Sequence, residues 1–130
     1  RAASGFSLER LTLLIAVLER RTKLNLSDKD IFINVVGGLK LNDRASDLAI
    51  CMAIASAAAE RKLREGGVVF GEVGLGGEIR SASLPDRRVN EAKKLGFTYA
   101  VAPRSAARNN KGFVIPATDL RDALNQHLTK

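Results

Sequence analysis

Hydrophobic and polar positions repeat along the chain with two periods, and each period predicts a different kind of element. From Ser7 to Arg21, leucines and isoleucines recur at spacings of three and four residues, which predicts a helix with one apolar stripe. Ser7 is a suitable N-cap for that helix. The cations at its far end, Arg20, Arg21 and Lys23, either compensate the helix dipole or contact a ligand, and the sequence leaves both interpretations open.

A second helix is predicted over Ala45–Leu63, where hardly any polar side chain occurs before Glu60. A helix that is apolar all round normally lies in the middle of a domain. Cys51 is therefore expected to be a small core residue, and a reactive thiol is the less favoured interpretation.

Two further helices are predicted in the second half of the chain. The segment from Asp86 to Leu95 is charged and amphipathic, and we expect Val89, Ala92 and Leu95 to face inward. A last helix is predicted to begin at Thr118, because apolar residues again recur at helical spacing after it.

Segments of β-branched and apolar residues between these helices predict strands. They are Asp30–Val36, Gly67–Val73, Thr98–Ala102 and Gly112–Ile115. Because strands and helices alternate, we expect an α/β or mixed α+β fold, in a single domain that spans residues 1–130.

Composition narrows the class of protein. The chain has 130 residues, of which 45% are apolar, and a net charge of +7, so disorder is excluded and polyanions at low salt are attracted. The alternative is a solvated surface that is basic without binding a polyanion.

A lone Cys51 and a lone His127 provide neither an internal disulfide nor a metal site. No apolar run is long enough to span a bilayer. The chain begins with Arg1, and we expect it to be a piece of a longer protein.

Three features of the sequence could indicate a nucleotide-binding or catalytic site. The glycine-rich Gly74–Gly77 lacks the Gly-Lys-Ser/Thr of a phosphate-binding loop, so we interpret it as a tight connection between strands. His127 is expected to be exposed near a helix end, which disfavours a histidine-dependent triad. A serine nucleophile with a lysine base remains an alternative, and Ser46 at the start of the second helix is the residue to consider.

A set of short motifs carries a resemblance to a known family. They are NVVGG at 34–38, DLA at 47–49 and FGEVGLGGEIR at 70–80, continued by Arg88, Glu91-Ala92, LGF at 95–97 and Pro103. Together these motifs resemble the C-terminal domain of the RadA (Sms) family of bacterial recombination and repair ATPases, over nearly the whole chain. That domain is similar to the proteolytic domain of Lon, a serine–lysine peptidase, and the resemblance implies a Lon-like fold with a mixed sheet packed against helices.

The resemblance also places the two positions of the Lon dyad. Ser46 falls where the nucleophile would be, and Asp86 falls where the catalytic lysine would be. A carboxylate cannot serve as the amine base, so the resemblance implies a vestigial dyad and no catalytic residue. The alternative is a Lon-type serine peptidase that uses Ser46 with an unidentified base. Lys40, Arg44 and Lys93 are the cations considered for that role.

The function implied by the resemblance is non-enzymatic. We expect a scaffold domain that helps its parent ATPase to assemble into a ring, a hexamer in the family, and that contacts single- and double-stranded DNA. The RecA recombinase is the implied partner, and the bacterial cytoplasm, with no membrane contact, the implied location. We expect no cofactor in this domain, since ATP, magnesium and zinc belong to the ATPase and zinc-finger domains that this chain lacks. A scaffold without a DNA role is a further alternative.

The residues themselves agree with DNA contact in one respect. Residues 80–111 hold eight cations against only Asp86 and Glu91. Such groups bind phosphates without reading bases, and the few aromatic residues disfavour a stacking platform. For any one of these cations, the alternative to phosphate contact is a place on the solvent-exposed face of a helix. The DNA-binding candidates are Lys40, Arg44, Arg80, Arg87, Arg88, Arg104 and Arg108.

Overall fold

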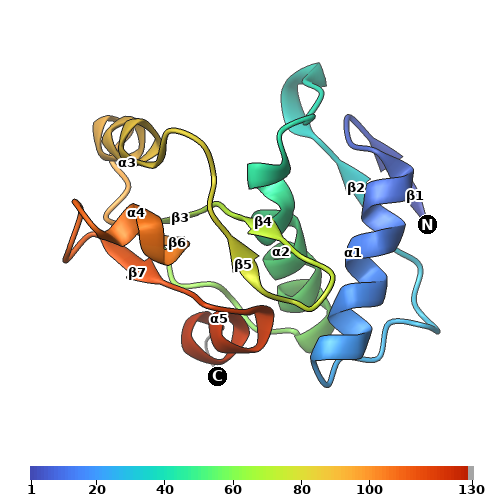
Figure 1. Ribbon diagram of the computed structural model, residues 1–130. Coiled ribbons are helices and arrows are strands. Elements are labelled where there is room, and N and C mark those ends of the chain that lie inside the picture. The colour runs from blue at the N-terminus through green and yellow to red at the C-terminus, as the bar shows by residue number, and fades with distance from the viewer. Residues whose placement is uncertain (129–130) are drawn as a thin grey trace.

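The computed structural model describes residues 1–128 and places helices on both faces of a small parallel sheet (Figure 1). The sheet contains β3 (Gly67–Val69), β6 (Tyr99–Ala102) and β7 (Val114–Pro116). Both pairings, β3 with β6 and β6 with β7, are parallel, so β6 is the central strand and β3 lies at an edge. The prediction of an α/β fold is confirmed.

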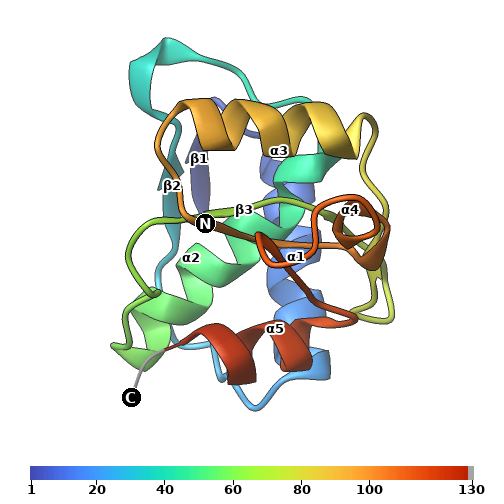
Figure 2. The same cartoon turned by 90° about the vertical axis from the view of Figure 1, so that its left-hand side faces the viewer.

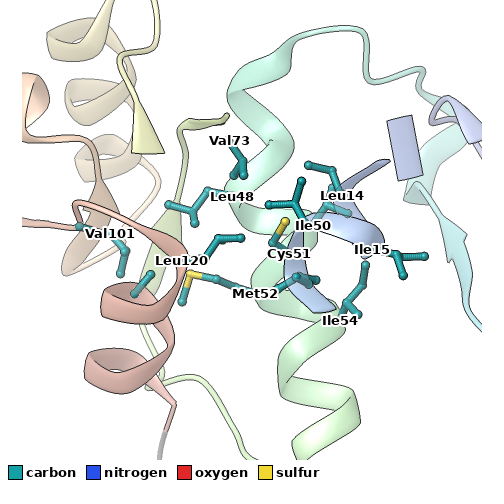
Figure 3. Packing of buried hydrophobic residues seen from close by; sticks show 14 of the residues in the cluster. Leu14, Ile15, Leu48, Ile50, Cys51, Met52, Ile54, Val73, Val101 and Leu120 are labelled. Carbon is teal, nitrogen blue, oxygen red and sulfur yellow. The ribbon is translucent and has the colours of Figure 1, made fainter. Parts of the chain in front are cut away.

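The main hydrophobic core lies on one face of this sheet. It is formed by α1 (Leu8–Arg21), α2 (Asp47–Ala59) and α5 (Leu120–His127), together with the side chains of Tyr99 and Val101 from β6. Figure 3 shows α2 side chains pointing toward both α1 and the sheet, as expected for a helix without a polar face. Among residues 1–128, the structure has no helix with the length and hydrophobicity needed to cross a bilayer.

A second, smaller cluster lies on the opposite face of the sheet. The helices α3 (Pro85–Lys94) and α4 (Arg104–Ala107) contribute Val89 and Ala106 to it, and β6 contributes Ala100 and Ala102. Every residue of β6 is therefore buried, which is typical of a parallel strand covered on both faces.

Two small two-stranded pairings complete the structure. The strands β1 (Ala2–Ser4) and β2 (Phe32–Asn34) are parallel, whereas β4 (Glu72–Val73) and β5 (Ile79–Arg80) form an antiparallel hairpin around the glycine-rich turn. Neither β1 nor the four-residue α4 was predicted, because segments this short show no usable periodicity.

The second helix is shorter at both ends than the predicted Ala45–Leu63. A 3₁₀ turn, Arg44–Ser46, precedes it, because the Asp43 carboxylate accepts a hydrogen bond from the amide of Ala45 at 2.9 Å. The helix ends where Glu60 adopts a left-handed conformation with φ of 54°.

Two predicted strands are also interrupted. The segment Gly67–Val73 is divided into β3 and β4 at Gly71, whose φ is 150° and whose amide donates to the carbonyl of Ala45 at 2.8 Å. The segment Asp30–Val36 is reduced to β2, since a 3₁₀ turn, Val36–Gly38, follows it with Gly37 at a φ of 86°.

Three expectations about single positions have different outcomes. Cys51 is fully buried, which confirms it as a core residue. Leu95, expected to face inward, is 69% exposed because it is already the C-cap of α3. His127, expected to be exposed, is buried on the inner face of α5, which begins at Leu120 rather than Thr118.

Candidate functional site: a groove at Ser46

Ser46, which the resemblance places at the Lon nucleophile, lies in the wall of a groove of about 760 Å³. The groove is bounded by α3, by the start of α2 and by the edge strand β3, and Figure 2 shows α3 lying across this end of the molecule. Most of its lining is apolar. The exposed rim includes Leu84 and Leu95, which are 62% and 69% accessible to solvent.

The hydroxyl of Ser46 is engaged with the backbone. Its Oγ donates a hydrogen bond of 2.8 Å to the carbonyl oxygen of Asp43, and the amide of Ser46 donates to the same oxygen at 3.1 Å. A carbonyl oxygen accepts a hydrogen bond but does not remove the proton. Both contacts stabilise the 3₁₀ turn before α2, which is a structural role for this serine.

The charged groups that line the groove are two arginines and two carboxylates. Arg88 pairs with Asp43 at 2.7 Å and also donates from Nε to the carbonyl of Ser83 at 2.8 Å. The Ala45 amide and the Arg88 guanidinium together hold the pKa of Asp43 below its ordinary value. Arg87 and Glu91 are the other two charged groups. Among residues 1–128, no lysine lines this groove.

The cations considered as alternative bases lie elsewhere. Lys40 lines a separate hollow beside β1 and β2, and Arg44 points toward Glu72 at 3.6 Å. The ammonium group of Lys93 lies 5.2 Å from the centre of the Phe113 ring. The described structure thus brings none of the three into the groove that Ser46 lines.

Asp86, at the position aligned with the catalytic lysine, does not line the groove either. Its carboxylate accepts hydrogen bonds from the side-chain amides of Asn109 at 3.1 Å and Asn110 at 2.8 Å. These contacts join α3 to the loop after α4. Ser46 lines the groove and Asp86 does not, so the two positions that the resemblance assigns to the dyad do not share this groove.

A buried ion pair is formed by the residue that follows Ser46, and sequence reasoning missed it. Asp47 is fully buried and binds Arg10 of α1, whose Nε donates to Oδ1 at 3.2 Å. The amide of Val73 donates to the other carboxylate oxygen at 3.2 Å. A single acidic residue inside an otherwise apolar helix is the signal that could have revealed this contact, since buried charges need partners.

The glycine-rich turn is confirmed as a connection between strands. The amide of Gly74 donates to the carbonyl of Glu78, and that of Gly77 donates to the carbonyl of Gly74, both at 2.9 Å. The amide of Gly76 donates to a carboxylate oxygen of Glu78 at 3.0 Å. Because these amides already have partners, the turn does not form an anion-binding loop of the Walker type.

The predicted DNA-binding residues fall into two groups. Arg44, Arg80 and Arg88 form ion pairs with Glu72, Glu78 and Asp43, respectively. Lys40, Arg87, Arg104 and Arg108 are exposed and form no ion pair with a carboxylate in the described part of the chain. Within residues 1–128 there is also no cluster of three or more potential metal ligands.

Comparison with known proteins identifies the family. A family model described as subunit ChlI of Mg-chelatase matches residues 6–118. The chain is 41% identical over 125 residues to the DNA repair protein RadA of Aquifex aeolicus, and 43% identical over 129 residues to that of Haemophilus influenzae. It is 46% identical over 103 residues to the DNA repair protein RadA of Escherichia coli.

The alignments cover most of this chain and a small part of each relative. They span 95%, 95% and 79% of the chain, but 28%, 28% and 22% of the three relatives, respectively. The chain therefore spans about a quarter of the length of these proteins. The resemblance to RadA that the motifs indicated is confirmed. The chain belongs to the family described as subunit ChlI of Mg-chelatase, and it is similar to part of each of these DNA repair proteins RadA.

Proposed function

We propose that this chain is a non-proteolytic scaffold domain of a RadA-like repair ATPase, which supports ring assembly and contacts DNA through its phosphate backbone. The observation that carries the first part is the 2.8 Å hydrogen bond from Ser46 to the carbonyl of Asp43. Ser46 lines a groove whose two cationic residues, Arg87 and Arg88, both carry guanidinium groups.

The chemistry of a serine peptidase needs a base that takes the proton of the hydroxyl. A guanidinium group stays protonated at any physiological pH and has no acceptor atom, so neither arginine can take this role. Asp43 and Glu91 are carboxylates, and a carboxylate is a weak base toward an alcohol at neutral pH. The Ala45 amide and Arg88 lower the pKa of Asp43 and so weaken it further as a base. Ser46 therefore stabilises the turn and does not attack a substrate.

The peptidase alternative is tested with an unfolded substrate. Fluorescein-labelled casein is incubated with the chain and with Ser46→Ala, and fluorescence release is followed at neutral pH. We expect both proteins to match buffer alone. Hydrolysis by the parent chain that is lost in Ser46→Ala would establish the peptidase instead.

Contact with the DNA backbone is supported by four exposed cations that form no ion pair within residues 1–128, namely Lys40, Arg87, Arg104 and Arg108. Phosphate contacts release counterions, so the affinity falls by about 0.9 in log units per contact for each log unit of salt on duplex DNA. Fluorescence anisotropy with labelled single- and double-stranded oligonucleotides should show binding at 50 mM salt that weakens steeply toward 200 mM. Equal affinity for unrelated sequences is expected. No binding at low salt would leave a scaffold without a DNA role.

Ring assembly is supported by an apolar surface around β2. Phe32, Val36 and Leu39 are 74%, 83% and 65% exposed. Phe32 lies in β2, and the other two lie in the turn after it, a segment that projects from the body of the molecule (Figure 1). Adjacent exposed apolar side chains commonly mark an interaction surface. A neighbouring copy in the ring, a hexamer as in the RadA family, would cover them.

The remaining parts of the proposal concern the longer protein. ATP, magnesium and zinc would bind outside this chain, where the parent would act as a DNA-dependent ATPase. RecA would be its recombination partner in the bacterial cytoplasm. These statements rest on the family relation alone.

A further inference from the structure

The cations of α1 and α5 meet at the end of the molecule opposite α3. Figures 1 and 2 both show the C-terminal end of α1 beside α5, with α3 at the other end. A hollow of about 260 Å³ at this place is lined by Arg20 and Arg21 from the last turn of α1 and by Arg121 from the first turn of α5. Three arginines from two helices that are far apart in the sequence thus line one hollow.

The glycine-rich turn fixes this arrangement. The amide of Leu120 donates to the carbonyl of Gly77 at 2.9 Å, which anchors the start of α5 to the turn. A Cβ at Gly77 would lie 3.0 Å from Cγ of Arg21, so the glycine leaves room for the stem of that arginine. The hollow is therefore part of the folded framework.

An adjoining hollow extends the positive surface. It has a volume of about 680 Å³, shares Arg121 with the first, and is also lined by Lys23 and Arg61. We call these five cations, Arg20, Arg21, Lys23, Arg61 and Arg121, the end-face cluster. All five are exposed.

The end-face cluster has almost no compensating negative charge. None of its five cations forms an ion pair with a carboxylate of residues 1–128. Asp119 is the one carboxylate that lines either hollow in this described part, and its Oδ1 accepts the amide of Asp122 at 2.7 Å as the N-cap of α5. By contrast, three of the seven DNA-binding candidates predicted from the sequence are neutralised by ion pairs.

Helix stability does not explain the whole cluster. Arg20 and Arg21 lie at the C-terminal end of α1, where the helix dipole favours cations. Arg121 lies at the N-terminal end of α5, where the same dipole disfavours a cation. Holding like charges together on a surface is unfavourable unless an anion neutralises them.

We propose that the end-face cluster binds the phosphate backbone of nucleic acid, at the end of the molecule opposite α3. The inference rests on the proposed contact with DNA and identifies a surface for it. This surface joins Arg20, Arg21 and Lys23, for which the sequence left ligand contact open, to Arg61 and Arg121. No aromatic side chain lines either hollow within residues 1–128, so bases are not stacked there and sequence is not read.

The test compares charge-neutral and charge-retaining variants of the full chain. Arg20→Gln/Arg21→Gln/Arg121→Gln removes three charges, and the matched triple Arg→Lys variant retains them. Binding to a labelled 30-base-pair duplex is measured by anisotropy between 50 and 200 mM salt. The glutamine variant is expected to bind at least about tenfold more weakly at 50 mM, with a salt slope smaller by about 2.7, since each phosphate contact contributes about 0.9. The lysine variant should keep most of the affinity and most of the salt slope of the wild-type chain.

Two further variants serve as controls. One keeps the packing of Arg21, and the other removes charges from a different surface. Arg20→Gln/Arg121→Gln leaves the packing of Arg21 against Gly77 intact, and it should still lower affinity and slope. Arg87→Gln/Arg104→Gln/Arg108→Gln removes three charges from α3 and the α4 region for comparison. Wild-type affinity in both end-face glutamine variants, with a loss only in the α3–α4 variant, would overturn this inference and leave DNA binding standing. Absence of binding by the wild-type chain at 50 mM salt would instead remove the proposed DNA contact itself.

Discussion

The guanidinium group of Arg10 on α1 binds the carboxylate of Asp47, the first residue of α2, and only 1% of the Asp47 side chain is exposed. The same guanidinium donates to the carbonyl of Val73 at 3.3 Å, and the Val73 amide donates back to Asp47. The pair therefore joins α1, α2 and the β4–β5 hairpin, at the residue next to Ser46 in the chain. The hydrogen bond with Asp47 raises the pKa of Arg10, so its positive charge is maintained.

Removing one partner of this pair should destabilise the fold strongly. Asp47→Asn leaves the partly buried Arg10 without its counter-charge, and breaking a buried pair in this way costs about 3–5 kcal/mol. Urea unfolding followed by circular dichroism measures the change in the free energy of unfolding. The exposed pair Arg80–Glu78 is the control, because Glu78→Gln should cost no more than about 1 kcal/mol. Equal effects of the two substitutions would contradict the structural role of Asp47.

Cys51 should be unreactive in the folded protein. Burial in the core raises the pKa of its thiol to about 12, so almost no thiolate exists at neutral pH. Labelling with iodoacetamide should follow the extent of unfolding as denaturant is added, as detected by intact mass. Rapid labelling of the native chain without denaturant would show that α2 is not the central helix described here.

Stability should decrease as the pH falls from 7 to 5, because of His127. Burial and the nearby positive charge of Arg64 lower its pKa in the folded state, although Asp122 opposes this shift. The unfolded chain therefore binds a proton below about pH 6.5 that the folded chain resists, which favours unfolding. His127→Leu should remove this dependence, as measured by urea midpoints at each pH. Since the chain has a single histidine, an unchanged slope in the variant would exclude this cause.

Assembly should depend on the apolar surface around β2. Sedimentation velocity of the chain is expected to show concentration-dependent association, which Val36→Asp/Leu39→Asp abolishes by placing charges in the interface. Leu75→Asp changes a similarly exposed leucine on the β4–β5 turn and should have no effect. Association that survives the first variant, or a chain that is monomeric at every concentration, would contradict the proposed surface.

The parts of the fold that the sequence predicted well are those with long, regular periodicity. The stripe of α1 and the uniform hydrophobicity of α2 located both helices and the burial of Cys51. The ends of α2 depended on local contacts, such as the Asp43 carboxylate with the Ala45 amide, that no periodic pattern encodes. His127 lies so near the chain end that its burial becomes evident only when α5 is packed against the core.

The sites depended even more on contacts between distant segments. Arg10 and Asp47 are 37 residues apart. The end-face cluster combines residues from α1 and the loop after it, from the segment that follows α2, and from α5. The densest basic stretch of the sequence, residues 80–111, was easier to recognise because its cations lie in one continuous segment of the chain. The structure shows that two of those cations, Arg80 and Arg88, already have acidic partners.

The central claim is that Ser46 has no base and does not attack substrates. Its most direct test is incubation of the chain with a fluorophosphonate that modifies activated serines, followed by intact-mass and peptide mass spectrometry. We predict no adduct on Ser46 after prolonged incubation at neutral pH. A stoichiometric adduct on Ser46, absent from Ser46→Ala and from the urea-unfolded chain, would contradict the account.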